Sequence, residues 1–248
     1  MADTQEKAHL RNRFIKEELP GIRVEGVDVD LFYIKEVLKR SKERGKVLDI
    51  GTGTAHIPIE LLRRGSHLEI FAIDLSEASL RIAKENSSGV ESIHILRADG
   101  YSLPFRESAF DEVIVRLAPH SIREAYRVLK RGGWYIHRAC GEYNCRKEIH
   151  EVFGDRALPY AEASWWRTTS GRLERYKKRG FSQVYEISFH VRRYYTLDQI
   201  IMEMRFNPIV RDFDPEKDRS KLEELKRRYG TEKGIRITGY PLIIFAQK

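Results

Sequence analysis

The chain has 248 residues, of which 41% are hydrophobic and 33% are charged. This length suits one large domain, or one domain with an elaborated cap, and the apolar content suffices for a core. No run approaches the roughly 20 apolar residues of a membrane span, and residues 1–16 carry no signal-peptide core. Cys140 and Cys145 are too few for a disulfide framework, and no Cys/His cluster has zinc spacing. We therefore expect a cytoplasmic protein without a metal.

The charge balance is basic, with 45 Lys and Arg against 37 Asp and Glu, which gives a net charge of +8. Such a balance permits an anionic partner but does not require one. Charged residues are abundant while Asn and Gln are scarce, a pattern typical of heat-adapted proteins. We expect a thermophilic source on this ground alone.

The predicted elements begin with two helices. The first spans about 8–19 and ends at Pro20-Gly21. The second spans 31–44, with Asp28 or Asp30 as its N-terminal cap and its apolar positions on one face. A leading helix of this kind would cover a ligand site on the following sheet.

Strands and helices then alternate. Short apolar runs bounded by turns predict buried strands, and amphipathic runs predict helices. This reading gives strands over 47–50, 68–74, 93–96, 110–117 and 134–139, and helices over 55–64, 77–86 and 121–130. Alternation at this spacing indicates parallel strands joined by right-handed crossovers. We therefore expect an α/β fold with a doubly wound sheet.

The alternation stops after residue 141. The patterns there predict helices over 146–153, 197–204 and 215–229, one half-exposed strand over 185–191, and further strands over 208–213 and 240–247. The helix at 215–229 has Asp214 as its expected cap, Pro215 at its first position and Gly230 at its end.

A glycine turn follows the first strand of the alternating region. Gly51, Gly53 and Ala55 form a G-x-G-x-A pattern between strand and helix, where glycine allows a sharp turn and close approach of a ligand. A dinucleotide fingerprint fails here, because it requires glycine or alanine where His56 stands. Ligands of open α/β sheets bind at this edge.

Two acids mark the ends of the next strands. Asp74 is placed to accept hydrogen bonds from ribose hydroxyls, which both nucleotide and dinucleotide cofactors carry. Asp99 can accept from an exocyclic adenine amine while neighbouring amides reach a ring nitrogen. A dehydrogenase has no standing need for that second acid, so the pair favours an adenosine-bearing cofactor of another class.

Four motifs in order then resemble the class I S-adenosylmethionine-dependent methyltransferases, and above all the ubiquinone/menaquinone-biosynthesis type. They are VLDIGTGTA (47–55), FAIDLS (71–76), RADGYSLPFRESAFDEVIV (97–115) and REAYRVLKRGGWYI (123–136). The resemblance covers about 45–140. It implies a Rossmann-like, three-layer, seven-stranded sheet whose last strand is antiparallel, which residues 240–247 resemble.

The resemblance also implies an organisation. Residues 1–45 would form N-terminal helices covering the cofactor site, 46–141 the S-adenosylmethionine-binding core, and 142–195 an inserted cap over the substrate. Residues 196–248 would complete the core sheet through a strand, a helix and a strand. The cofactor would be S-adenosyl-L-methionine, with S-adenosyl-L-homocysteine as the product.

The cofactor contacts follow from the resemblance residue by residue. Asp49, Gly51 and Gly53 would line the methionine part, Asp74 the ribose, and Asp99, Gly100 and Tyr101 the adenine. Thr52, Leu75 and Arg116 complete the predicted cofactor site.

One region departs from the family. The loop after the fourth strand, 113–121, is shorter than in relatives and has a single histidine, His120. His120 is our candidate for a catalytic base or substrate contact; the alternatives are a loop histidine without a role and one that caps the helix at Ser121. Arg116 suits an anionic substrate or an ordinary ion pair. Tyr33 in the second helix is a candidate substrate contact, or core.

The expected cap carries the remaining candidates. Trp165 and Trp166 can stack on a planar acceptor or anchor the cap to the sheet. Residues 167–193 concentrate basic side chains among aromatics, which suits phosphate contacts and base stacking as well as a solvated surface.

We therefore expect methyl transfer to a small-molecule acceptor. An RNA methyltransferase that uses the basic cap is one alternative, and a non-catalytic protein that binds the cofactor or its product is another. A dehydrogenase is the weakest of the alternative functions. The sequence does not name the acceptor, the atom methylated or the oligomeric state.

Overall fold

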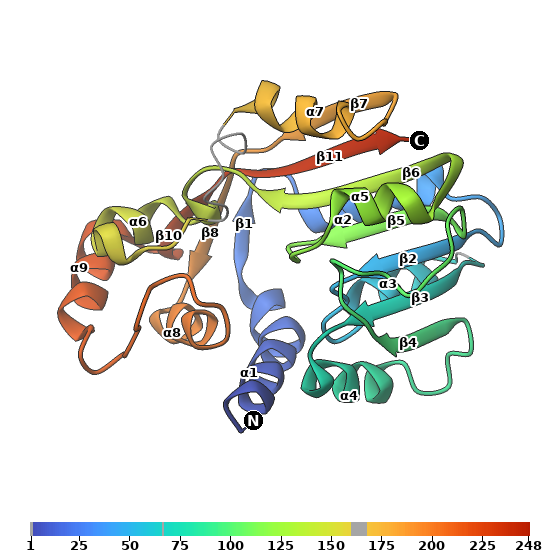
Figure 1. The fold of residues 1–248 in the computed structure, drawn as a ribbon. Coiled ribbons are helices and arrows are strands. Elements are labelled where there is room, and N and C mark those ends of the chain that lie inside the picture. Colours follow the sequence, from blue (N-terminus) through green and yellow to red (C-terminus); the bar gives the residue numbers. More distant parts are fainter. Residues whose placement is uncertain (1, 66, 160–167) are drawn as a thin grey trace. The chain divides into compact units, whose positions relative to one another are not determined.

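The computed structural model describes residues 2–65, 67–159 and 168–248 (Figure 1). The chain divides into two compact units, neither of which is a continuous stretch of sequence. The first unit consists of Met1–Asp28, Cys140–Ala163 and Ser188–Leu242, and the second of Val29–Ala139, Ser164–Ile187 and Ile243–Lys248.

The second unit is built on a seven-stranded sheet. Its strands lie in the order β4-β3-β2-β5-β6-β11-β7, which places β2, the first strand of the alternating region, in the interior of the sheet between β3 and β5 (Figure 1). The strands are β2 Lys46–Ile50, β3 Glu69–Asp74, β4 Ile93–Arg97, β5 Phe110–Arg116, β6 Leu129–Cys140, β7 Gln183–Ser188 and β11 Pro241–Gln247. β2 to β6 pair in parallel.

β11 runs against its neighbour β6. The N–H of Gly132 donates to the carbonyl of Lys248 at one end of β6, and the N–H of Gly141 donates to that of Tyr240 at the other. These two bonds show that β6 and β11 are antiparallel. The predicted doubly wound sheet of seven strands with an antiparallel last strand is confirmed.

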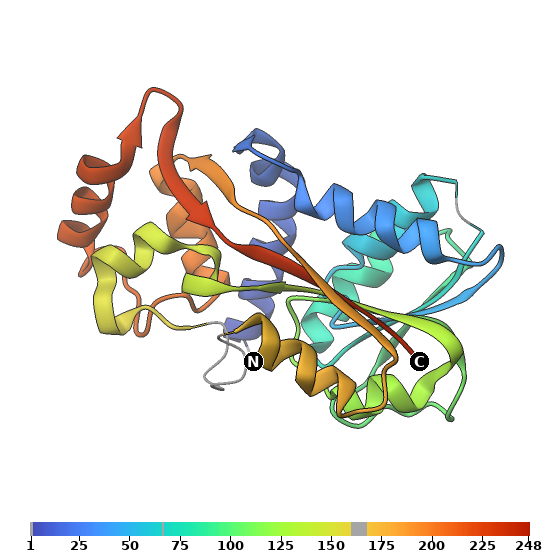
Figure 2. The same cartoon turned by 90° about the horizontal axis from the view of Figure 1, so that it is seen from above.

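Helices cover both faces of this sheet (Figure 2). α2 Val29–Arg40, α3 His56–Arg63 and α4 Glu77–Asn86 lie on one face, and α5 Ile122–Val128 and α7 Thr169–Lys177 on the other. The Ser76 hydroxyl accepts from the N–H of Ser79 and so caps α4, and the Ser121 hydroxyl caps α5 in the same way by accepting from the N–H of Glu124. Helices on both faces bury the central strands, and β5 has six of its seven residues buried.

The first unit has a sheet of its own. Its four strands lie in the order β1-β8-β10-β9 and pair antiparallel. They are β1 Arg23–Glu25, β8 Val191–Tyr195, β9 Gly230–Thr231 and β10 Gly234–Gly239. The helical elements of this unit are α1 Ala2–Arg13, η1 Phe14–Glu18, η2 Leu19–Gly21, η3 Glu142–Cys145, α6 Lys147–Phe153, η4 Gly154–Arg156, α8 Leu197–Phe206 and α9 Arg219–Tyr229.

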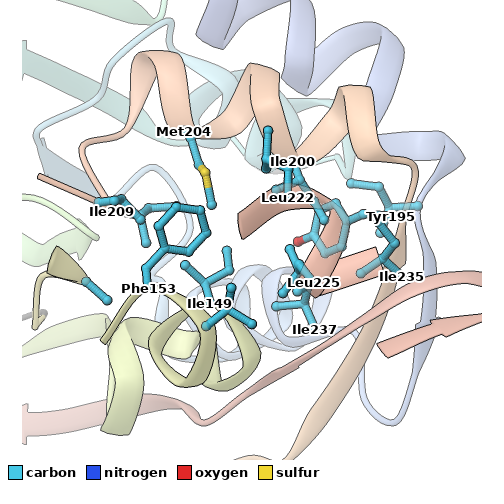
Figure 3. Close-up of a cluster of buried hydrophobic side chains, with 14 of the residues drawn as sticks. Ile149, Phe153, Tyr195, Ile200, Met204, Ile209, Leu222, Leu225, Ile235 and Ile237 are labelled. Carbon is cyan, nitrogen blue, oxygen red and sulfur yellow. The ribbon is translucent and has the colours of Figure 1, made fainter. Parts of the chain in front are cut away.

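A hydrophobic cluster holds the first unit together (Figure 3). Ile149 and Phe153 of α6, Ile200 and Met204 of α8 and Leu225 of α9 are all buried in it, with Ile235 and Ile237 of β10 at the sheet. Burial of this apolar surface, at about 25 cal/mol per Å², gives the unit its own core.

Several predicted elements differ from the structure. The alternating run at 185–191 is two strands in two sheets, since β7 ends at Ser188 and β8 begins at Val191. The strand predicted over 208–213 is wrong: Val210 forms only an isolated bridge with Ala157. The last predicted helix begins at Arg219, because Asp214 accepts from two backbone N–H groups and closes a separate turn.

The chain passes from one unit to the other after Asp28, Ala139, Ile187 and Leu242. Among the described residues, no helix is both long enough and apolar enough to cross a bilayer.

Candidate functional site: the carboxyl edge of the seven-stranded sheet

The glycine turn lies between β2 and α3. Gly51 and Gly53 have φ values of +74° and +59°, and Ala55 caps α3 at +61°. These left-handed conformations are open to glycine at little cost, which explains the first two residue types. The N–H groups of Gly51 and Thr52 both donate to the carbonyl of Ile73, so they fasten the turn to β3 instead of facing outward.

Asp74 is held by this turn. One carboxylate oxygen accepts from the N–H of Gly53 at 2.9 Å, and the other accepts from the N–H of Ser76 at 2.9 Å. Each oxygen keeps a further lone pair. The carboxylate is thereby oriented at the end of β3, where the predicted ribose contact would lie.

Asp99 follows β4 and is exposed. Its carboxylate accepts from the N–H of Tyr101 at 2.9 Å. Leu75 and Tyr101 are each 60% exposed, although both carry large apolar surfaces. Exposed apolar side chains beside two fixed carboxylates are typical of a binding site for a flat, partly polar group.

Asp49 is buried at the end of β2, with 2% of its surface exposed. Its Oδ2 atom makes no hydrogen bond of good geometry, and the Thr52 side chain is close enough to oppose the rise in its pKa. Burial raises the pKa of Asp49 to about 7, and Asp74 adds to the rise. A buried carboxylate in this state would be stabilised by a cationic ligand group.

The loop after β5 lies directly on the glycine turn. A Cβ atom placed on Gly51 would lie 2.1 Å from the Cβ of Ala118. A Cβ placed on Gly100 would lie 3.0 Å from the carbonyl oxygen of Pro119 and 3.3 Å from the Cβ of His120. The loop thus requires glycine at both predicted cofactor positions.

His120 is tied to the protein through both ring nitrogens. Nδ1 lies 2.9 Å from the carbonyl oxygen of Ala118, and Nε2 lies 2.5 Å from the hydroxyl of Tyr135. Burial lowers the pKa of His120 to about 4, so the ring is neutral at pH 7. A role as base would require one of these two bonds to be exchanged for a bond to substrate.

Arg116 ends β5 and donates two hydrogen bonds to Asp30, at 3.1 and 2.6 Å. Arg138 stands beside Arg116 on β6 and approaches the same carboxylate to 3.3 Å. Tyr33 is fully buried, and its hydroxyl lies 3.3 Å from the carbonyl of Val115. Arg116 and Tyr33, predicted to contact ligands, thus have protein partners.

The remaining predicted candidates are the tryptophan pair and the basic segment of the expected cap. Trp165 and Trp166 lie outside the described residues. In the basic segment, Arg172 of α7 is buried and donates two hydrogen bonds of 2.6 Å to Glu186. Across the described residues, no group of His, Cys, Asp and Glu side chains could hold a metal ion.

Two tyrosines were missed at the sequence level. Tyr135 of β6 reaches His120, and Tyr176 of α7 lies 2.9 Å from Nδ1 of His137. The sequence does contain a pattern that could have indicated Tyr135. Tyr135 and His137 are two residues apart, so they share one face of a buried strand, where polar side chains need partners. Nothing in the sequence pairs them with Tyr176.

Comparison with known proteins finds a methyltransferase domain in the region that contains these residues. Residues 47–133 match a family described as a methyltransferase domain, Methyltransf_25. A demethylmenaquinone methyltransferase of Staphylococcus haemolyticus is 35% identical over 41% of this chain and 47% of its own length. Another, from Thermotoga maritima, is 28% identical over 68% of this chain and 72% of its own.

A solved structure shows the same fold. Phosphoethanolamine N-methyltransferase 2 of Haemonchus contortus, in complex with phosphomonomethylethanolamine and S-adenosylhomocysteine, superimposes with a TM-score of 0.56. It is 17% identical, and the match covers 89% of this chain and 53% of that one.

The glycine turn, the acids at the ends of β3 and β4 and these matches define a class I S-adenosylmethionine-dependent methyltransferase domain. Over part of its length, the chain is similar to demethylmenaquinone methyltransferases. The match spans about half the length of the Staphylococcus haemolyticus relative.

Proposed function

We propose that this protein binds S-adenosylmethionine at the carboxyl edge of β2, β3 and β4 and transfers its methyl group to a small-molecule acceptor. The observation that carries the proposal is the buried Oδ2 atom of Asp49, which lies beside the glycine turn and makes no hydrogen bond of good geometry. Such an atom is costly unless a ligand supplies a donor or a positive charge.

The residues fit the three parts of this cofactor. Asp49 would face the ammonium of the methionine part, and Asp74 would accept from the ribose hydroxyls. Asp99 would accept from the adenine amine, while Leu75 and Tyr101, both 60% exposed, would be covered by the adenine ring. Gly51 and Gly100 allow the loop after β5 to pack closely against this edge of the sheet.

When bound, the cofactor supplies an activated methyl group and its own leaving group, so the reaction is an in-line displacement. The protein contributes alignment and exclusion of water. A base is needed only when the acceptor atom carries a proton that must leave. His120 is neutral and already hydrogen-bonded, so its part would be to shape the site, or to act as base after releasing Tyr135.

The acceptor is proposed from the named relatives. Both curated relatives are demethylmenaquinone methyltransferases, which favours a quinol-like small molecule over RNA. The basic segment is a weaker argument for RNA, because Arg172 serves as an internal ion-pair partner of Glu186.

Calorimetric titration with S-adenosylmethionine, S-adenosylhomocysteine and NAD tests the proposal. The proposal is supported if S-adenosylmethionine and S-adenosylhomocysteine bind at micromolar concentrations and NAD does not. It is refuted if neither S-adenosylmethionine nor S-adenosylhomocysteine binds. Turnover would then be compared on a demethylated quinol and on bulk RNA at rising salt. RNA binding weakens steeply with salt, whereas binding of a neutral quinol would not.

A further inference from the structure

Buried polar side chains connect the loop after β5 to the interior of the second unit. His120 Nε2 lies 2.5 Å from the Tyr135 hydroxyl, and the Tyr176 hydroxyl lies 2.9 Å from Nδ1 of His137. Tyr135 and Tyr176 are fully buried, and their ring centroids are 5.6 Å apart. His120 and His137 meet edge to face at 4.8 Å. These four side chains form a single cluster.

The direction of the first link can be assigned. The carbonyl of Ala118 only accepts, so the proton of the His120 ring sits on Nδ1. In the neutral ring Nε2 is then an acceptor, and the Tyr135 hydroxyl donates to it. Burial raises the pKa of Tyr176, and a hydrogen bond with Tyr135 offsets part of that rise. The hydroxyl of Tyr135 thus has a partner on each side.

His120 is part of the loop that sets the width of the cofactor site. Ala118 contacts Gly51, and Pro119 and His120 contact Gly100, so the loop touches the edge of the site at both predicted ends of the cofactor. Leu117 has a φ of +54°, a left-handed conformation that a branched side chain adopts only when its surroundings enforce it. The N–H of Leu117 donates to the carbonyl of Arg138 at 3.0 Å, which fixes the start of the loop, and the ring of His120 is anchored at its other end.

We propose that Tyr135 and Tyr176 are positioning residues that hold the His120 ring, and with it the loop 117–121, in the place that cofactor binding requires. This inference rests on the proposed function. It extends the site to α7, since Tyr176 belongs to that helix.

A purely structural role predicts a different response. The rings of Tyr135 and Tyr176 pack against Phe181 at 5.6 and 6.2 Å, and phenylalanine would preserve this packing. Removing only the hydroxyl leaves Nε2 of His120 without its donor, and such a loss costs about a factor of ten in an equilibrium constant. The two roles are therefore separated by Tyr-to-Phe substitutions.

The test compares Tyr135→Phe and Tyr176→Phe with Tyr185→Phe as the matched control. The Tyr185 hydroxyl accepts from Arg40 at 2.5 Å within the same unit, and its ring packs against Trp134 and Phe245. The first measurement is the ¹⁵N spectrum of the histidine rings against pH, without cofactor. The second is calorimetric affinity for S-adenosylhomocysteine, with thermal unfolding to confirm folding.

The expected results are specific. In Tyr135→Phe the His120 Nε2 resonance should move, its titration should shift toward higher pH, and affinity should fall about tenfold. Tyr176→Phe, one step further away, should show both effects more weakly, and Tyr185→Phe should match wild type. If Tyr135→Phe does not fold, Tyr176→Phe carries the test.

Two failures can be told apart. Unchanged His120 resonances in both variants, or unchanged affinity alongside wild-type binding, would refute the positioning role alone. A wild-type chain that binds no S-adenosylhomocysteine would refute the proposed function, and with it the inference.

Discussion

Ala118 lies over Gly51 so closely that a Cβ atom on Gly51 would come within 2.1 Å of the Cβ of Ala118. Gly51→Ala should therefore displace the loop after β5 and reduce cofactor affinity more than tenfold, as measured by calorimetry. Gly89→Ala is the matched control, because Gly89 has a similar φ of +80° with no atom within 4 Å. It carries the backbone strain without the clash. Equal affinity losses in both variants would contradict the steric explanation, whereas partial rescue of Gly51→Ala by Ala118→Gly would support it.

Asp49 should make cofactor binding depend on pH. Burial raises its pKa to about 7, and a cationic ligand group would favour the charged carboxylate. Affinity for S-adenosylhomocysteine should therefore fall as pH drops below about 7, approaching tenfold per unit. Asp49→Asn should abolish this slope between pH 5.5 and 7 and weaken binding at pH 7. A wild-type affinity that is constant over this range would refute the assignment.

Asp74 and Asp99 should differ from His120 in what they control. Asp74→Ala and Asp99→Ala each remove acceptors from the proposed adenosine site, so each should weaken binding by roughly 1–3 kcal/mol. His120→Ala should lower turnover more than affinity if the ring contacts the acceptor. Steady-state kinetics combined with calorimetry separates these effects. Full activity of His120→Ala on the true acceptor would remove its proposed catalytic part.

Glu112 should make stability depend on pH. It is 1% exposed in β5, and burial raises its pKa to about 8. The folded state therefore binds a proton that the unfolded state releases above about pH 4.5, so stability should fall between pH 4.5 and 8. Glu112→Gln should raise the free energy of unfolding at pH 8 by on the order of 3 kcal/mol. Urea unfolding across this range tests it, with the exposed Glu107→Gln as control. Some slope should persist in Glu112→Gln, because Asp49 titrates in the same window.

Lys248 should stabilise the end of α5. Its ammonium donates to the carbonyls of Tyr126 and Leu129, both at 2.8 Å, and lies 4.5 Å from the ring centroid of Tyr126. Lys248→Met leaves these carbonyls without their donor and should cost about 1–3 kcal/mol in urea unfolding. The exposed Lys39→Met in the same unit should change stability little. Equal effects would show that Lys248 acts through charge alone.

The sequence predicted the second unit well because its signals are local. Each strand from β2 to β6 has an apolar run, and the residue types at Gly51, Asp74 and Ser76 follow from turns and caps within a few positions. The four-stranded sheet was not predicted. The alternation of apolar and polar residues continues from Tyr185 through Val191, across the point where the chain changes sheets, so periodicity alone reads it as one strand.

The site was predicted only in part, for a related reason. Positions that contact a ligand through backbone geometry or through an acid at a strand end leave a local pattern. The contacts of His120 with Tyr135, and of Arg116 with Asp30, join residues 15 and 86 positions apart. Whether a histidine ring or a guanidinium is free for substrate depends on such distant partners, which a single sequence does not show.

The two strands β10 and β11 are separated by Tyr240 alone, yet each occupies an interior position in a different sheet. The stretch 234–247 therefore completes both units at once. Removal of this stretch would leave a gap in each sheet and expose unpaired strand edges in both. Neither unit can therefore be excised as a continuous fragment, and a change in this stretch should affect the stability of both.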